Sequence, residues 1–141
     1  MNSDCIFCKI IAGEIPSSKV YEDEYTLAFM DISPIVKGHT LVIPKSHHDP
    51  ITKTPDEVLS RCIIMAKRVA QAQMNVLDAD GVNLHQANGA AAGQVVPHIH
   101  FHVIPRYDDD NHHWNWNSRE YDSMDEMAGI GERLNAEMLN G

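Results

Sequence analysis

Three histidines alternate with apolar residues late in the chain, where His98, His100 and His102 are separated by Ile99 and Phe101. Successive side chains of a β-strand point to opposite faces, so this spacing predicts three imidazoles on one face and an apolar row facing the core. Three charged imidazoles so close together would repel one another, so most are expected to be neutral near pH 7. The pattern predicts a metal site or a catalytic site, because a plain structural strand rarely carries it.

A segment rich in glycine and alanine, residues 88–94, comes directly before this row. Glycines let backbone N–H groups approach an anion closely, and successive N–H groups form a nest for phosphate oxygens. Alone, such a segment is more typical of a simple turn, but beside the histidines it favours a phosphate ligand. The histidines themselves allow two chemistries. They are either ligands of a transition metal with an open position, or a neutral imidazole nucleophile beside a group that moves protons.

Two cysteines near the N-terminus, Cys5 and Cys8, have the spacing of a redox pair or of two metal ligands. A thioredoxin-type pair follows a strand, and no strand is expected before Cys5, so zinc is favoured. Two cysteines and two histidines complete the closed tetrahedral set of a structural zinc site. The histidine ligands are expected to be His98 and either His47 or His48.

A long helix is expected to begin with Thr54 as its N-cap and to run to about Leu77. Its apolar residues, spaced by three and four, form a broad stripe that includes Ile63 and Val76. Cys62 lies in this stripe and is predicted to be a buried thiol without chemistry of its own.

The remaining pattern predicts short strands and two further helices, which together indicate an α+β domain. These elements are a short helix capped by Asp4, strands at residues 19–21, 26–30, 39–43, 81–86 and 98–104, and a terminal helix that begins at a capping box formed by Ser123 and Glu126.

The 141 residues, 43% of them hydrophobic and 22% charged, predict one globular domain with a core at residues 4–106 and a C-terminal loop and helix at 107–141. The formal charge of −9 argues against sequence-independent binding to nucleic acid, which needs a basic surface. No apolar run approaches the ~18 residues of a membrane span, so no membrane partner is expected. The N-terminus lacks a secretory signal, which favours a cytoplasmic location.

Taken together, these motifs resemble the histidine triad (HIT) family of nucleotide-binding proteins, and the match runs from about Asp4 to Arg106. The matching motifs are the triad His98-x-His100-x-His102, the segment Cys5 to Ile10, Phe29 to Asp31, Gly38 to His47, and Ala92 to Gln94.

The resemblance implies an antiparallel five-stranded sheet with one long helix and short terminal helices, extended across a two-fold axis in a homodimer. It implies a hydrolase that acts on a purine nucleotide, transferring the nucleotidyl group to the middle histidine, His100. Water then hydrolyses this phosphoramidate, so one difficult displacement is split into two. The role implied for His102 is to contact the phosphate and assist proton transfer.

The resemblance also implies binding roles for residues outside the triad. Phe7, Ile10 and Phe29 would surround the base, Asp31 would bind the ribose, Asn88, Gly93, Gln94 and the backbone near Val95 would hold the α-phosphate, and His39 would lie close to it. One structural zinc per chain would be bound by Cys5, Cys8, His47 and His98, with His47 preferred over His48 because it occupies the family position.

Two features depart from the family pattern. Many relatives have serine or threonine where this chain has Val95, which leaves the leaving group open. The segment at residues 108–117, with two histidines and two tryptophans, matches no family motif and is expected to be a solvated loop. The alternatives are a dinucleoside polyphosphate hydrolase, a nucleotide sensor without turnover, and a metal-dependent hydrolase that uses all three triad histidines.

Overall fold

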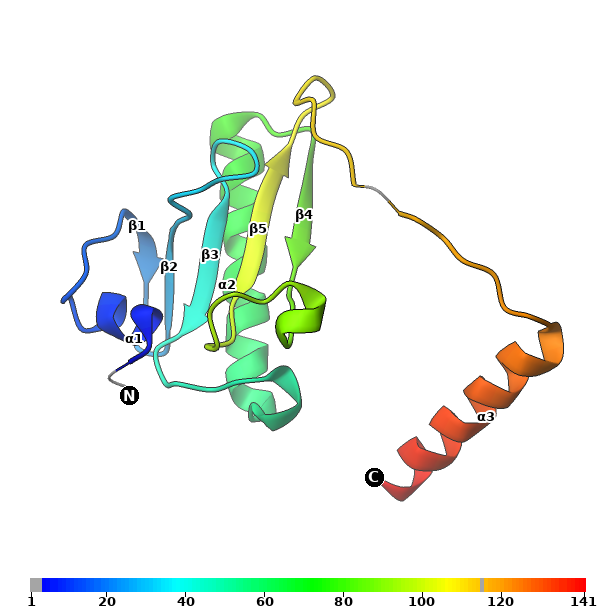
Figure 1. Cartoon of the computed structure of the whole chain (residues 1–141). Helices are drawn as coiled ribbons and strands as arrows, with labels where there is room; N and C mark the ends of the chain where they lie inside the picture. The colour runs from blue at the N-terminus through cyan, green and yellow to red at the C-terminus, as the bar shows by residue number, and fades with distance from the viewer. Residues whose placement is uncertain (1–3, 115) are drawn as a thin grey trace.

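The computed structural model describes residues 4–114 and 116–141, and its centre is a five-stranded antiparallel sheet (Figure 1). The strand order is β1-β2-β3-β5-β4. The strands are β1 (Lys19–Glu22), β2 (Thr26–Met30), β3 (Thr40–Pro44), β4 (Gly81–His85) and β5 (Phe101–Arg106). The helices are α1 (Ile6–Ile11), α2 (Asp56–Leu77) and α3 (Met124–Asn140), with 3-10 turns η1 (Ile51–Lys53) and η2 (Ala90–Ala92). The α+β class and the antiparallel five-stranded sheet are therefore confirmed.

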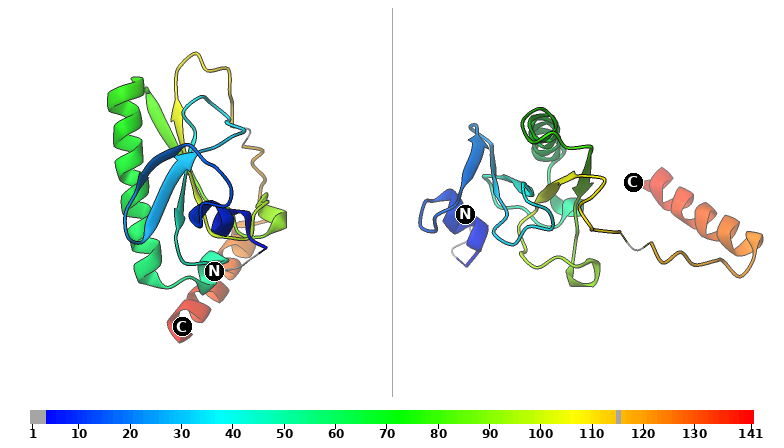
Figure 2. Two further views of the ribbon diagram at one scale, coloured as in Figure 1. Left: turned by 90° about the vertical axis from the view of Figure 1, so that its left-hand side faces the viewer. Right: turned by 90° about the horizontal axis from the view of Figure 1, so that it is seen from above.

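The central strands are buried on both faces, and their alternation divides the core in two. Ala28 of β2 and Phe101 of β5 pack with the buried side of α2. Leu27 and Phe29, the neighbours of Ala28, point the other way and pack with Phe7 of α1. The long helix and the short one thus cover opposite faces of the sheet (Figure 2). Such alternation follows from the two-residue period of a strand.

Helix α2 ends at Leu77 as expected, but its start and its width differ from the prediction. Pro55, not Thr54, is the N-cap residue, because the Thr54 hydroxyl donates to the Pro50 carbonyl oxygen at 2.8 Å and so closes the turn η1. Val76 is 76% exposed and Ile63 is 45% exposed, so the stripe that faces the sheet is narrower than predicted. Cys62 is fully buried, as expected for a core thiol.

Three predicted boundaries of helices and strands differ in the structure. Cys5 rather than Asp4 caps α1, since its sulfur accepts the Cys8 N–H at 3.4 Å. Strand β3 begins one residue later than expected, at Thr40, and includes Pro44. Strand β5 begins only at Phe101.

The residues directly before β5 form a bend at 96–98 and do not belong to a strand. The N–H of His98 donates to the Val96 carbonyl and that of Ile99 donates to the His48 carbonyl, at 2.9 and 2.8 Å. Pro97 has no N–H to offer a ladder. Even so, Ile99 is buried in the core with Phe101, so the histidines between and beside them face the other way.

Helix α3 stands apart from the sheet, as Figure 1 and the right view of Figure 2 show. Its N-terminus is the predicted capping box: the Ser123 hydroxyl oxygen accepts the Glu126 N–H, and the Glu126 carboxylate accepts the Asp122 N–H. None of its described residues is buried, and its apolar positions, such as Leu134, face solvent. Among the described residues, no helix is both long and apolar enough to cross a lipid bilayer.

Candidate functional site

Four metal-ligand side chains from three separate segments converge beside α1. Cys5 and Cys8 come from the start of the helix, His47 follows β3, and His98 precedes β5. One ligand atom from each residue lies within 4.8 Å of the others. His48 stays outside this cluster, where its ring contacts Ser46. The structure therefore brings together all four residues predicted to bind zinc.

The distances in this cluster fit a tetrahedral metal ion. Zn–S bonds of about 2.3 Å and Zn–N bonds of about 2.0–2.1 Å place ligand atoms roughly 3.3–3.8 Å apart. The His98 Nδ1 atom lies 3.4 Å from the Cys5 sulfur, 3.6 Å from the Cys8 sulfur and 3.1 Å from His47 Nδ1. The Cys8 sulfur lies 3.4 Å from His47 Nδ1. Both the donor types and their spacing fit zinc.

A hydrogen bond on the ring nitrogen that faces away from the cysteines fixes the orientation of the His98 ring. Its Nε2–H donates to the Pro44 carbonyl oxygen at 2.9 Å, so Nδ1 presents its lone pair to the two sulfurs. Burial lowers the pKa of His98 to about 4, and the neutral ring is the form that binds metal. A carbonyl on the far nitrogen is the usual outer partner of a metal-bound histidine.

The middle histidine, His100, has a defined tautomer. Its Nδ1 lies 2.7 Å from the His98 carbonyl oxygen, which can only accept, so Nδ1 carries the proton. Burial lowers the pKa of His100, so the ring is neutral and its lone pair is on Nε2. His100 lines a hollow next to the sheet. A neutral imidazole in this state is a nucleophile ready to attack an electrophilic centre.

The third histidine, His102, lies among other imidazoles. Its ring centroid is 5.0 Å from that of His100, and its Nδ1 is 2.9 Å from Nε2 of His39, which in turn lies 3.4 Å from a carboxylate oxygen of Asp31. Burial is the main cause that lowers the pKa of His102 to about 4. The positive charges that His100, His39 and His85 would carry act in the same direction. His102 is therefore neutral at physiological pH.

A hollow of about 920 Å³ opens in front of His100 and His102, large enough for a nucleotide. Eight residues predicted to act at the site line it: Phe7, Ile10, Phe29, Asp31, Gly93, Val95, His100 and His102. Sequence reasoning missed other lining residues, among them Ile15 and Ser18, because only the packing of α1 and its following loop against β2 brings them there.

Three predicted binding residues do not line this hollow. His39 is 2% exposed and lies behind His102. The side-chain oxygen of Asn88 accepts the Ile51 N–H at 2.8 Å, and the Gln94 amide donates to Asp49 at 2.7 Å. These two amides hold the glycine-rich segment to the loop after β3.

The glycine-rich segment itself has the backbone conformation that its sequence predicts. Gly89 and Gly93 have φ angles of 88° and 90°, a region that other residues rarely adopt, and they flank the turn η2. The Gln94 side-chain oxygen accepts the Gly89 N–H, which closes the turn from within. The segment is a preformed loop at the rim of the hollow.

Comparison with known proteins settles the family. The family model described as "HIT domain" matches residues 12–109. This chain belongs to the HIT family. It is 38% identical to an adenosine 5′-monophosphoramidase of Candida albicans over 141 residues, which covers 97% of this chain and 93% of that protein.

Solved HIT structures share its fold, and one of them is described as zinc-bound. A HIT family protein from Bacillus anthracis is 42% identical, with a TM-score of 0.87 over 97% of this chain and 99% of its own. A zinc-bound histidine triad family protein from Mycobacterium smegmatis is 38% identical, with a TM-score of 0.75 over 94% of this chain and 96% of its own.

Sequence reasoning missed two residues of this HIT protein that lie beside His102. His85 pairs with His102 across β4 and β5, and their ring centroids are 5.5 Å apart. Trp114 stacks on His85 at 5.9 Å, and its indole N–H donates to Asn83. The signal in the sequence was weak, because only the register of β4 against β5 places His85 here. The loop after β5 thus begins at the edge of the site, where it had been expected to be solvated.

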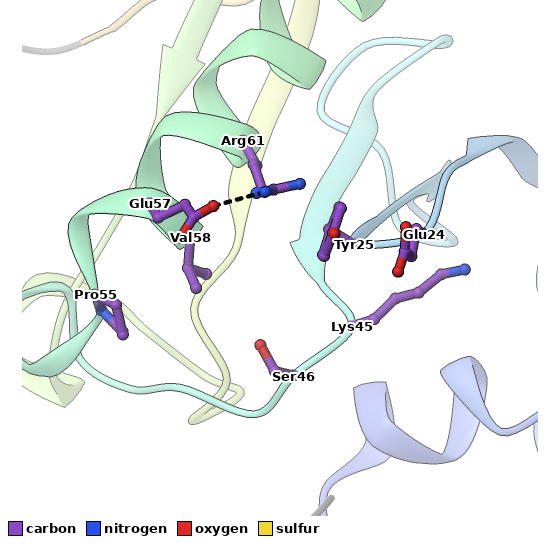
Figure 3. Close-up of a pocket in the computed structure, with 8 residues that line it drawn as sticks. All are labelled: Glu24, Tyr25, Lys45, Ser46, Pro55, Glu57, Val58 and Arg61. Atoms are coloured by element: carbon purple, nitrogen blue, oxygen red, sulfur yellow. Dashed lines mark hydrogen bonds and ion pairs between the residues drawn. The ribbon is translucent and has the colours of Figure 1, made fainter.

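A second hollow of about 560 Å³ lies where β2 begins and β3 ends, beside the start of α2 (Figure 3). Three of its four charged side chains, Lys45, Glu57 and Arg61, already have partners. Arg61 pairs with Glu57 and lies over the Tyr25 ring, and Lys45 pairs with Glu22. None of the residues predicted to act in this HIT protein lines it.

The depressed pKa of His102 predicts that the fold is sensitive to acid. An unfolded histidine titrates near 6.5, whereas His102 in the fold titrates near 4. Unfolding therefore takes up a proton, so the stability that neutral His102 provides is complete above pH 6.5 and is lost as the pH falls toward 4. Urea unfolding of the wild type should lose more free energy between pH 7 and about pH 4.5 than a His102→Asn variant loses. Equal losses in the two proteins would contradict this assignment.

Proposed function

We propose that this protein hydrolyses purine nucleoside phosphoramidates at the α-phosphate through a covalent nucleotidyl intermediate on His100. The observation that carries the proposal is the hydrogen bond from His100 Nδ1 to the His98 carbonyl, which leaves the Nε2 lone pair of a neutral ring beside a hollow of nucleotide size. The activity named for the Candida albicans relative supports the same reaction class.

The reaction has two displacements. Nε2 of His100 forms a bond to the α-phosphorus while the bond from phosphorus to the leaving nitrogen breaks, and the amine departs with the electron pair and gains a proton. The modified ring is then cationic, and its Nδ1–H still donates to the His98 carbonyl oxygen, which stabilises the charge. Water next attacks phosphorus, breaks the P–N bond to His100 and releases the nucleoside monophosphate and a proton.

The shape of the hollow supports an orientation for the nucleotide. Phe7 and Phe29 meet edge to face at 5.6 Å and form an apolar wall for the base. Asp31 accepts the Ser33 N–H through one oxygen, which holds its carboxylate at the rim for the ribose hydroxyls. Gly93 and Val95 lie on the histidine side of the hollow, where the phosphate would be.

Direct turnover tests this function. We expect the protein to release AMP from an adenosine phosphoramidate, with binding measured in parallel by calorimetry. Tight binding without any product would instead favour the sensor. A kcat/KM at least about tenfold higher for a dinucleoside polyphosphate would make the latter the substrate class.

We propose that one zinc ion binds Cys5, Cys8, His47 and His98 in each chain and has a structural role. The tetrahedral fit of the four ligand atoms and the zinc-bound relative support this. Bound zinc would hold α1 against the segment before β5. It would therefore act on the reaction only through the position of the His98 carbonyl.

We propose that the protein forms a homodimer through β4 and α2. Strand β4 ends the sheet and has β5 as its only strand neighbour among the described residues, so its other edge is open to pairing. Beside this edge, Leu84 of β4 is 49% exposed, and the outer side of α2 exposes Ile64 (58%) and Met74 (51%). Apolar groups of this size on an outer face support contact with a second chain.

Sedimentation velocity tests the dimer. The wild type is expected to sediment as a dimer, and Ile64→Glu should shift it toward the monomer because a charge would be buried in the contact. Val20→Glu is the matched control, since Val20 is 43% exposed on β1 at the opposite edge of the sheet. A wild type that stays monomeric at high concentration would refute the proposal.

Two further expectations stand as proposals. Residues 4–106 form the folding core of a single domain, and this is supported by α3, which contributes no buried residue to it. The cytoplasmic location is supported by three free cysteines, two of them in a zinc-type cluster that needs reduced thiols.

A further inference from the structure

A backbone N–H determines the protonation of His39. The loop between β2 and β3 turns back on itself, and the Ile35 N–H donates to Nδ1 of His39 at 3.1 Å. A backbone N–H only donates, so Nδ1 must carry a lone pair. Burial lowers the pKa of His39, which keeps the ring neutral. The single ring proton of His39 therefore lies on Nε2.

That proton determines the tautomer of the next ring. Nε2 of His39 lies 2.9 Å from Nδ1 of His102, within hydrogen-bond distance, whereas the Asp31 carboxylate oxygen is farther away at 3.4 Å. Because His39 donates, Nδ1 of His102 accepts. A neutral His102 then carries its own proton on Nε2.

We propose that His39 is a positioning residue, oriented by the Ile35 backbone, that fixes His102 as the Nε2–H tautomer and makes it a hydrogen-bond donor rather than an acid. Protonation of His102 on Nδ1 would set two N–H groups against each other at 2.9 Å. The other titratable groups that face His102 are His100, His85 and Asp31; of these, only Asp31 is anionic, and it lies beside His39. The acceptor, an oxygen of the α-phosphate, rests on the proposed function, but the tautomer itself does not.

The same hydrogen bonds argue against a second metal ion. Asp31, His39 and His102 offer ligand atoms within 4.8 Å of one another, a grouping of the two-histidine, one-carboxylate type. A metal on Nε2 of His39 would force its proton onto Nδ1, where it would face the Ile35 N–H. The cluster therefore works as a chain of hydrogen bonds from the Ile35 backbone to His102.

Nitrogen-15 NMR of the imidazoles, on the full chain without substrate, reads these tautomers directly. We expect His39 and His102 each to show a protonated Nε2 and an unprotonated Nδ1 at pH 7. The exposed ring of His113 is the internal control and should show a mixture of both tautomers. A wild-type His102 protonated on Nδ1 would overturn the inference, whatever the activity of the protein.

Three variants test this chain of hydrogen bonds one bond at a time. Ile35→Pro removes the N–H together with the isoleucine side chain, and His39 and His102 should both become mixtures, whereas Ile35→Ala loses the same side chain but keeps the N–H and both tautomers. His39→Leu removes the donor and should give the same mixture at His102, so the test stands even where the proline variant fails to fold. Unchanged His102 signals in folded His39→Leu would contradict the assignment.

Turnover gives an independent readout. His39→Leu is expected to lower kcat by about 10- to 100-fold, as is typical of residues that orient a functional group, with KM changed by less than about threefold. His39→Gln, whose amide nitrogen can donate to His102, should recover part of the loss. No recovery, or a loss confined to KM, would argue against positioning. An inactive wild type with the expected tautomers would refute the proposed function and leave the tautomer assignment intact.

Discussion

Replacing His100 with alanine is expected to lower kcat by at least about 10⁴-fold, because no other side chain takes over a covalent step once its nucleophile is lost. Nucleotide affinity should change little, since the base and ribose would be held by Phe7, Phe29 and Asp31 at the rim of the same hollow. The measurement is single-turnover release of AMP from an adenosine phosphoramidate, with binding followed by calorimetry.

A matched control separates this effect from a general loss of histidine. His113 is exposed and belongs to the loop after β5, so His113→Ala should retain wild-type turnover and stability. A His100→Ala variant that keeps more than about a tenth of wild-type kcat would exclude the covalent mechanism.

Removal of the metal is the second large effect that we expect. Chelation of the zinc-loaded protein should lower the free energy of unfolding by several kcal/mol, because four ligands from three segments would lose their common partner. Cys8 and His98 are buried, so their unpaired polar atoms would stay in the core. Elemental analysis should find one zinc per chain, and thermal unfolding with and without chelator should show the loss.

The Cys8→Ser variant tests whether the loss of stability on chelation comes from metal bound at these four ligands. It should be less stable than the wild type and should respond little to chelator, since one ligand is already weakened. While the chelated wild type remains folded, turnover should persist, because His100 and His102 lie outside the cluster. Activity that disappears with the metal before any unfolding would instead favour the metal-dependent hydrolase.

Much of this site could be predicted from the sequence, because its chemistry depends on spacing. Alternation along one strand places Ile99 and Phe101 in the core and so turns the histidines the other way. The donor types of Cys5, Cys8 and His98 indicated zinc, and the resemblance to the HIT family favoured His47 over His48 as the fourth ligand. The resemblance implied different roles for two of the triad histidines, and the structure places them in different surroundings. His98 faces the cysteine sulfurs, whereas His100 faces the hollow.

The features that could not be predicted from the sequence depend mostly on strand register and on side chains that have more than one possible hydrogen-bond partner. His85 is beside His102 only because β4 pairs with β5 in one register. Asn88, which is predicted to bind phosphate, has an oxygen that accepts the Ile51 N–H. Thr54 was expected to cap α2, but its hydroxyl donates to the preceding turn. A side chain with two possible local partners cannot be assigned from its position in the chain.

The covalent intermediate on His100 is the central claim, and intact-protein mass spectrometry of a rapidly quenched reaction tests it most directly. The protein should gain the mass of one nucleotidyl group within a single turnover, the added group should map to the peptide that contains His100, and it should disappear as AMP is released. Release of AMP at the wild-type rate with no adduct at any time, or with the adduct on another residue, would contradict the account.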